Sequence, residues 1–255
     1  MKINYITCSD PRDHNSLDDL FGLWQLDDRV EIAVQMHPGK VSPGTDRYEW
    51  VRALVDRLKD DLYPYNFAMH INSAWCYDVC NGKIPDALKE FFDAAYRIDK
   101  TPMPAVRRIQ LNMPEGAANS LKPYVLADVI KSFPNQEFII QYNDVTKAAV
   151  ERLHETGAQF SLLFDSSGGR GISPKSWSAP VYPEHPMGYS GGFSPETVVE
   201  KLDKISAVVP AGDKIWIDAE KGLTVPDENG KNLFNIERAR EYITNTLNWM
   251  RQNRR

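Results

Sequence analysis

The chain has 255 residues, of which 42% are hydrophobic and 25% are charged, and its formal net charge is −5 at pH 7. These values exclude a collagen-like, low-complexity or wholly disordered chain, and the acidic balance argues against a general nucleic-acid-binding protein. No uncharged apolar run approaches the roughly 18 residues of a membrane span, and three cysteines imply no disulfide framework. We therefore expect a cytoplasmic protein whose partners include neither nucleic acid nor a membrane.

Eight short apolar runs predict strands. Each is bounded by polar, glycine or proline residues, as strands in a compact fold usually are. In chain order they are Ile3–Ile6, Val30–Met36, Asn66–Ile71, Val106–Leu111, Glu137–Gln141, Gln159–Phe164, Met187–Ser190 and Ile215–Asp218.

The segments between these runs carry apolar residues at helical spacing. Ser16 is a favourable N-cap for the first of them. In chain order the predicted helices cover Leu17–Trp24, Val51–Leu58, Leu88–Ala95, Leu126–Phe133, Ala149–Leu153, Val198–Ile205 and Ile236–Met250.

Strands that alternate with helices favour an α/β fold with a parallel sheet. Eight such units in 255 residues fit a single (β/α)8 TIM barrel domain over residues 1–255, with a doubly wound sheet as the alternative. Pro180, Pro183 and Pro186 precede the seventh strand. Because proline breaks helices, we expect an irregular or missing sixth helix.

Polar residues gather where the predicted strands end. In a TIM barrel, the C-terminal strand ends carry the ligand chemistry, so these residues are candidates for substrate binding. They are His37, His70, Asn72, Asn112, Gln141, Ser190 and Asp218. The alternative for each is that buried polar side chains simply satisfy one another or ordered water.

A glycine pair, Gly191-Gly192, follows the seventh strand and precedes Ser194-Pro195, which begin a predicted helix. Glycines let backbone N–H groups approach an anion, and a helix N-terminus favours negative charge. We therefore expect a phosphate at Gly191 and Gly192, with an ordinary capped turn as the alternative.

The sixth strand ends at Asp165, before a glycine-rich loop that contains Arg170. Asp165 is a candidate acid or base, and Arg170 is a candidate anion clamp. The loop to Pro186 carries Trp177 and Tyr182. It is either a lid over the site or a static surface loop.

Cys8 ends the first strand, where a thiolate can act as base or nucleophile, although a lone cysteine is more often a small buried hydrophobe. Cys76 and Cys80 lack further zinc ligands nearby. His37 and His70 occur in no metal-binding motif. We expect neither a metal nor another cofactor.

The segment from Leu162-Leu163-Phe164-Asp165 to Gly168-Gly169-Arg170-Gly171, together with Trp177, resembles the sixth-strand region of phosphoribosylanthranilate isomerases. The sequence from Gly191-Gly192 to Glu196-Thr197-Val198 is similar to the phosphate loop of that family. Asp218 and Gly222 occupy the place of its Asp-x-Ser-Ser-Gly ending, and Cys8 that of its catalytic cysteine. The similarity is good over residues 160–222 and is otherwise mainly topological.

This resemblance implies an Amadori rearrangement of a phosphoribosyl amine, with Cys8 as general base, Asp165 as general acid and Gly222 in the substrate site. The chain departs from the family at Ser9, Glu220 and Lys221, and at Gln35 and His37, where a basic residue is expected. The fold therefore carries over better than the reaction.

We accordingly expect an isomerase of the aldose–ketose type that acts on a phosphorylated small-molecule substrate by acid–base catalysis. Two alternatives remain: another phosphate-binding barrel enzyme such as a lyase or aldolase, and a non-catalytic metabolite-binding barrel. No strand end carries an obvious Schiff-base lysine, which weakens the aldolase. The sequence leaves a homo-oligomer open.

Overall fold

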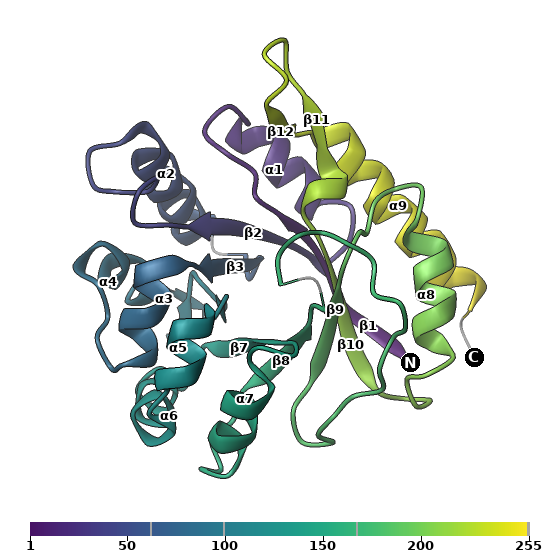
Figure 1. The fold of residues 1–255 in the computed structure, drawn as a ribbon. Helices are drawn as coiled ribbons and strands as arrows, with labels where there is room; N and C mark the ends of the chain where they lie inside the picture. Colours follow the sequence, from purple (N-terminus) through teal and green to yellow (C-terminus); the bar gives the residue numbers. More distant parts are fainter. Residues whose placement is uncertain (62, 99, 167, 254–255) are drawn as a thin grey trace. The chain divides into compact units, whose positions relative to one another are not determined.

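A computed structural model describes residues 1–61, 63–98, 100–166 and 168–253. Eight parallel strands form a closed barrel in the order β1-β10-β9-β8-β7-β6-β3-β2 (Figure 1). All eight predicted strands are confirmed, and with them the TIM-barrel fold. The barrel strands are β1 (Lys2–Ser9), β2 (Val30–Met36), β3 (Asn66–Ile71), β6 (Arg108–Leu111), β7 (Glu137–Tyr142), β8 (Ser161–Phe164), β9 (Met187–Ser190) and β10 (Lys214–Ala219).

The helices lie between the strands in sequence. Ser16 caps the first one, because its side chain accepts the Asp19 N–H at 3.1 Å, as its position predicts. The helices are α1 (Leu17–Trp24), α2 (Asp46–Asp60), α3 (Ser73–Cys80), α4 (Asp86–Phe92), α5 (Glu115–Ser120), α6 (Pro123–Ser132), α7 (Lys147–His154), α8 (Val198–Ser206) and α9 (Ile236–Gln252), with a 3₁₀ turn, η1 (Lys221–Leu223).

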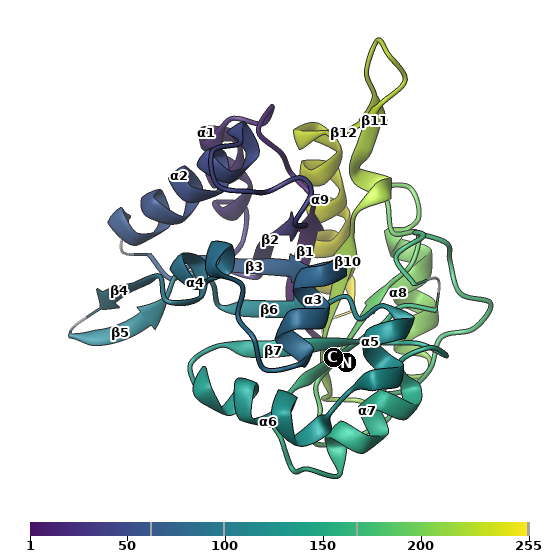
Figure 2. The ribbon, with the colours of Figure 1, turned by 60° about the vertical axis from the view of Figure 1, so that its left-hand side comes forward.

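Two hairpins add to this pattern. The strands β4 (Ala95–Ile98) and β5 (Thr101–Pro104) pair in one of them (Figure 2), and β11 (Thr224–Pro226) and β12 (Asn232–Phe234) pair in the other. The prediction that the third helix continues to Ala95 is wrong, because α4 ends at Phe92 and Ala95 pairs with Pro104. Proline lacks an N–H group, but an edge position in a two-stranded hairpin tolerates it.

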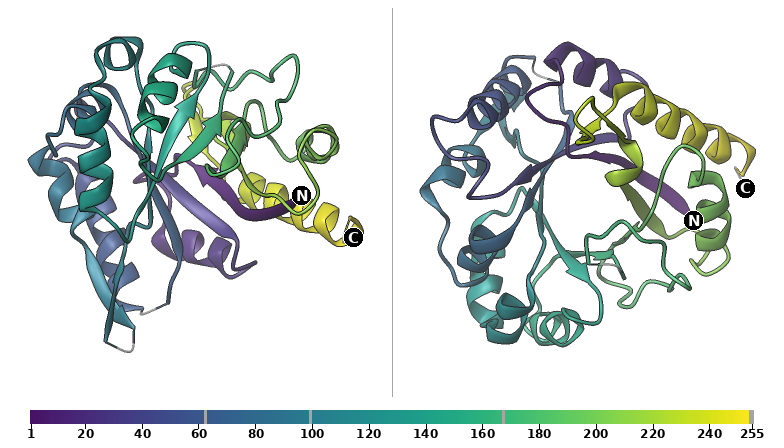
Figure 3. Two further views of the ribbon diagram at one scale, coloured as in Figure 1. Left: turned by 90° about the horizontal axis from the view of Figure 1, so that it is seen from below. Right: turned by 45° about the horizontal axis from the view of Figure 1, so that its top comes forward.

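Contacts divide the chain into two compact units. The first unit comprises Met1–Ala33 and Leu162–Arg255, and the second comprises Val34–Ser161. In the first unit α9 packs against α8, α1 and β1, and both chain ends belong to this unit (Figure 3). In the second unit α6 packs against α7 and α3.

The core of the first unit depends on a glycine. A Cβ atom on Gly188 would lie 2.0 Å from Cε2 of Trp216, on the neighbouring strand β10. The bare backbone of β9 therefore provides the space that the indole ring fills.

The segment between β8 and β9 contains no helix among its described residues, as the prolines predict. An aromatic cluster anchors it instead. The Trp177 ring lies 5.9 Å from that of Tyr189 and 5.7 Å from that of Phe193, between ring centroids. The Tyr189 hydroxyl donates to the Ser178 carbonyl at 2.8 Å.

Among the helices of the described residues, none combines the length and the apolar character needed to cross a membrane.

Candidate functional site

Four carboxyl groups lie at or directly after the C-terminal ends of strands in the first unit. Asp10 follows β1, Asp165 follows β8, and β10 carries Asp218 and leads directly to Glu220. Asp10, Asp165 and Asp218 are buried and Glu220 is half-buried. We call these four residues the carboxyl cluster. Because burial and like charges disfavour ionisation, the pKa values of Asp218 and Glu220 are raised.

Asp218 is the most strongly perturbed member of the carboxyl cluster. Its side chain accepts a hydrogen bond from Ser9 Oγ at 2.5 Å, and the residue is 8% exposed. Burial raises the pKa of Asp218 to about 8, with further increases from the charges of Glu220, Glu31 and Asp165, whereas the Ser9 hydrogen bond acts in the opposite direction. Asp218 therefore holds a proton at pH 7 and can donate it.

Glu220 titrates close to neutrality. Burial and the charge of Asp10 raise its pKa to about 7, while the cations of Lys221 and Arg12 oppose the shift. Arg12 is itself ion-paired to Asp10. A carboxyl group with such a pKa is about half ionised at pH 7 and can accept a proton.

Asp165 lies where the sequence predicts an acid or base. Its Oδ2 atom accepts the N–H group of Gly169 at 2.5 Å, which fixes the carboxyl group against the following loop. Arg170 is exposed, and its backbone carbonyl accepts a hydrogen bond from Lys221 Nζ at 2.8 Å. The roles of Asp165 as acid and of Arg170 as anion clamp stay predictions.

The environment of Cys8 argues against its predicted role as general base. Side chains alternate along a strand, and the flanking Thr7 and Ser9 hydroxyls bond to Glu31 and Asp218, so Cys8 lies on the opposite face of β1. Cys8 is 0% exposed. Burial, with the charges of Asp218 and Glu31, raises its thiol pKa well above the usual value. Cys8 is therefore a protonated core residue at neutral pH.

The predicted phosphate loop is a tight turn. Gly191 and Gly192 have φ angles of +124° and +64°, which favour glycine. Gly222, in the loop after β10, is also required, because a Cβ atom there would lie 2.0 Å from the Phe193 carbonyl oxygen. The Ser190 hydroxyl faces the Phe164 carbonyl oxygen at 3.4 Å. The loops after β9 and β10 are thus packed against each other.

In the second unit, the predicted residues His70, Asn72 and Asn112 form a hydrogen-bonded group with two glutamines that are not among the predicted residues, Gln35 and Gln110. Asn112 Nδ2 donates to Asn72 Oδ1 at 2.9 Å, and Asn72 Nδ2 donates to Gln35 Oε1 at 2.7 Å. Gln110 Nε2 donates to Asn112 Oδ1 at 2.9 Å. The amide groups of Gln35 and Gln110 both approach His70 Nδ1, at 3.3 and 3.4 Å. We call these five residues the amide network. Its members bind one another, which is the alternative to substrate binding for polar side chains at the strand ends.

His70 is the neutral member of this network. It is 2% exposed, and burial, together with the charge of Arg108, lowers its pKa to about 3. The two amide groups donate to Nδ1, so the proton of the neutral ring resides on Nε2. His70 therefore serves as a donor through Nε2 and as an acceptor through Nδ1.

Two further predicted residues of the second unit are His37 and Gln141. His37 Nε2 and Ser73 Oγ are 2.8 Å apart, and His37 Nδ1 accepts the N–H of Gly39 at 3.1 Å. Gln141 is buried near the end of β7, and its backbone carbonyl accepts the Thr146 hydroxyl at 2.6 Å. Their predicted roles in substrate binding stay predictions.

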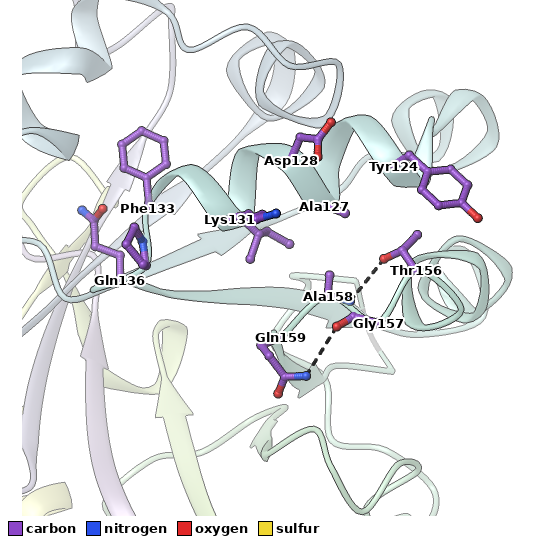
Figure 4. A pocket seen from close by; sticks show the side chains of 12 residues that line it. Tyr124, Ala127, Asp128, Lys131, Phe133, Gln136, Thr156, Gly157, Ala158 and Gln159 are labelled. Atoms are coloured by element: carbon purple, nitrogen blue, oxygen red, sulfur yellow. Dashed lines mark hydrogen bonds between the residues drawn. The ribbon is translucent and has the colours of Figure 1, made fainter.

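A pocket of about 570 Å³ occupies another part of the second unit (Figure 4). Its walls come from α6 with the turn before β7 and from the loop that follows α7. It is lined by Tyr124, Ala127, Asp128, Ile130, Lys131, Phe133, Pro134, Gln136, Thr156, Gly157, Ala158 and Gln159. These residues precede the strands, whereas the candidate residues follow them, so none of the predicted site residues lines this pocket.

Several residues of the site are missing from the sequence-based prediction. Ser9 donates a hydrogen bond to Asp218, and Glu220 lies one residue beyond the end of β10. Glu31 accepts a hydrogen bond from Thr7 on the neighbouring strand, and its charge raises the pKa of Asp218. A signal for Glu31 is present in the sequence, because it is a charged residue inside the apolar run Val30–Met36. A charge in such a run needs a partner.

No model of a known protein family matches the sequence, and no curated protein matches it either.

Proposed function

We propose that the chain is an isomerase that converts a phosphorylated aldose derivative into the corresponding ketose derivative, with carboxyl groups of the first unit as acid and base. The observation that carries this proposal is the raised pKa of Asp218, about 8, beside Glu220 with a pKa of about 7. Neighbouring groups that titrate on either side of neutrality are suited to give and take protons in one reaction.

The reaction requires two proton transfers. Protonation of the ring oxygen O4 breaks the C1–O4 bond, and removal of the proton from C2 gives an enol or enamine that tautomerises to the ketose. Asp218, protonated at pH 7, supplies the proton to O4. Glu220, partly ionised at pH 7, accepts the proton from C2.

Asp165 has a different part in this scheme from the one that the resemblance implies. Its charge raises the pKa of both Asp218 and Glu220, so it tunes the acid–base pair. The prediction that Asp165 is itself the proton donor remains the alternative. An Asp165→Asn variant separates the two, because a tuning role shifts the pH profile whereas a donor role abolishes turnover.

The phosphate of the substrate is assigned to the turn at Gly191 and Gly192, ahead of α8. The positive φ angles of these glycines and the helix that follows support this assignment. Glu220 would repel a phosphate group, and the cations of Lys221 and Arg12 offset that repulsion.

The test is an activity assay with phosphoribosylanthranilate and other N-substituted ribosylamine 5-phosphates as substrates. Its two readouts are formation of the product and exchange of the C2 hydrogen with solvent deuterium. Asp218→Asn and Glu220→Gln should each lower turnover by a factor of about 10² to 10⁴, with substrate binding retained. Glu228→Gln, in the exposed turn between β11 and β12, is the matched control.

Full turnover in both variants would contradict the acid–base assignment. Binding of a sugar phosphate without turnover or C2 exchange in the natural chain would instead favour a non-catalytic metabolite-binding barrel.

A further inference from the structure

Lys201 is a buried cation without a carboxylate partner. It lies in the second turn of α8, and the residue is only 7% exposed. Its Nζ atom donates to Ser173 Oγ at 2.5 Å and lies 6.0 Å from the ring centroid of Phe193. Within the part of the chain that the structure describes, Lys201 forms no ion pair. An ammonium group has three N–H donors, and a buried charge is costly unless an opposite charge or several acceptors surround it.

The predicted phosphate turn and this cation share a neighbour, the Ser173 hydroxyl. A Cβ atom on Gly192 would lie 2.7 Å from Ser173 Oγ, so the same hydroxyl lies against both the glycine and Lys201. Among the described residues, the N–H groups of Gly192 and Phe193 donate no hydrogen bond. Unpaired backbone donors beside a buried ammonium match the oxygens of an anion.

A segment of the loop after β8, residues 171–174, covers this turn. The Ile172 carbonyl oxygen would lie 3.0 Å from a Cβ atom on Gly191, and the Ser173 N atom 3.2 Å from one on Gly192. We call this segment the strap. Ser173 is exposed to solvent on its other side, so the strap can be displaced without opening the core.

Two lysines make polar contacts with the strap and with the residue before it. Lys201 binds Ser173 Oγ, and Lys221 Nζ binds the Arg170 carbonyl directly before the strap. A typical hydrogen bond contributes about 0.5–1.5 kcal/mol net, and somewhat more when one partner is charged. An anion with two or three oxygens offers Lys201 a stronger partner than a single neutral hydroxyl.

We propose that Lys201 is the cationic ligand of the substrate phosphate and that this phosphate displaces the Ser173 hydroxyl from it. The inference rests on the proposed function and deepens it. It adds a residue from α8 to the phosphate site and makes strap opening a condition of phosphate binding. Ser173 and the phosphate then compete for one ammonium group.

The test measures binding of inorganic phosphate and of ribose 5-phosphate by calorimetry. Lys201→Met should weaken binding at least about tenfold, because it removes a charge-assisted hydrogen bond. Lys204→Met is the control. Lys204 lies three residues further along α8 on its exposed side and pairs with Glu200, so its replacement should leave the affinity unchanged. Ser173→Ala should tighten binding by about two- to tenfold, since it removes the competing hydroxyl.

Each outcome decides a different point. If the natural chain binds neither probe, the phosphate assignment of the proposed function fails. If the natural chain binds and Lys201→Met binds as well as Lys204→Met, the role of Lys201 is refuted while the proposed function stands. If Ser173→Ala weakens binding, the hydroxyl is a ligand and the competition is refuted. Because Ser173 is exposed, its variant gives an answer even where the lysine variant fails to fold.

Hydrogen–deuterium exchange supplies a readout that is independent of affinity. Saturating ribose 5-phosphate should increase exchange across the strap in the natural chain and leave it unchanged in Lys201→Met. Slower exchange in the natural chain would show that the strap closes on the anion instead, and would overturn the displacement.

Discussion

The Ser9 hydroxyl donates a hydrogen bond to Asp218 Oδ1 across 2.5 Å and so joins the end of β1 to the end of β10. This bond stabilises the ionised carboxylate and therefore opposes the increase in the Asp218 pKa caused by burial. Ser9→Ala should raise the pKa of Asp218 further, by about 1–2 units for a charged hydrogen bond. Carboxyl ¹³C NMR titration measures the shift, and Ser206→Ala on the exposed side of α8 is the control. An unchanged titration would show that the hydrogen bond has no influence on the carboxyl group.

Asp218 should make the stability of the fold decrease as pH rises. Its pKa is about 8 in the folded chain against 3.8 for the ordinary group, so the folded state binds the extra proton throughout this range. The resulting stabilisation is complete below pH 3.8 and is lost as pH rises to about 8.

Between pH 5 and pH 8, the free energy of unfolding should therefore decrease less in Asp218→Asn than in the natural chain. Urea denaturation at a series of pH values measures this decrease. Glu220, with its pKa of about 7, contributes in the same direction. Asp128→Asn, at an exposed position of α6, should behave as the natural chain. An equal pH dependence in Asp218→Asn and the natural chain would contradict the buried, protonated state of Asp218.

Cys8→Ala should keep most of the turnover, in contrast to a catalytic cysteine. The thiol is fully buried on the face of β1 opposite Ser9, and its raised pKa keeps it protonated. We expect a modest destabilisation of about 1 kcal/mol, as for loss of a small buried group. Steady-state kinetics and a thermal melt measure both quantities. If a folded Cys8→Ala variant lost most of its turnover, the result would support the prediction that the Cys8 thiol is the general base.

Gly222→Ala should disturb the phosphate turn. The new methyl group would lie 2.0 Å from the Phe193 carbonyl oxygen, a contact that backbone movement alone can relieve. We expect at least about tenfold weaker binding of ribose 5-phosphate, because displacement of a binding group by about 1 Å is costly. Gly116→Ala is the matched control, since a methyl group there meets no atom within 4 Å. Equal affinities for ribose 5-phosphate in the two variants would show that the turn at Phe193 does not bind the phosphate.

Arg108 should be important for stability. It is buried in the second unit, and its guanidinium group binds Glu137 at 3.0 and 3.4 Å, while Ser161 Oγ donates to the same carboxylate. Arg108→Met should cost about 1–3 kcal/mol, since it removes two charged hydrogen bonds from Glu137, whose side chain is 31% exposed. Joint replacement of Arg108 and Glu137 by methionine should recover part of that loss in urea denaturation. A double variant less stable than Arg108→Met would show that the pair is not the source of the effect.

The sequence predicts the barrel well because its strands are short apolar runs separated by clear turn signals. Proline also predicts that no sixth helix forms, and the described residues between β8 and β9 contain none, since proline excludes the hydrogen bonds of a helix. The β4–β5 hairpin escapes prediction because Thr101-Pro102-Met103-Pro104 carries the residue least typical of strands. Its pairing depends on the opposite strand, which local sequence does not reveal.

The site is less predictable than the fold for a different reason. The strand ends identify Asp218 and Asp165, but the pKa of Asp218 depends on burial and on charges that include Glu31, on the distant strand β2. Cys8 has the same position in the sequence as a catalytic thiol, yet the register of β1 turns it away from Ser9 and Asp218. Which face a strand residue occupies follows from pairing, and a shift of one residue reverses it.

The amide network has a direction. Asn112 donates to Asn72, and Asn72 donates to Gln35, so each amide group is oriented by its neighbour. The sequence of donors ends at His70 Nδ1, which accepts because the ring is neutral. Protonating His70 would turn this acceptor into a donor, and both glutamine amides would have to rotate to face it with their oxygens. The neutral ring therefore fixes the orientation of the Gln35 and Gln110 amide groups, on the two strands beside β3. The Asn72 amide is held independently, because its Nδ2 also donates to the His70 backbone carbonyl at 2.8 Å.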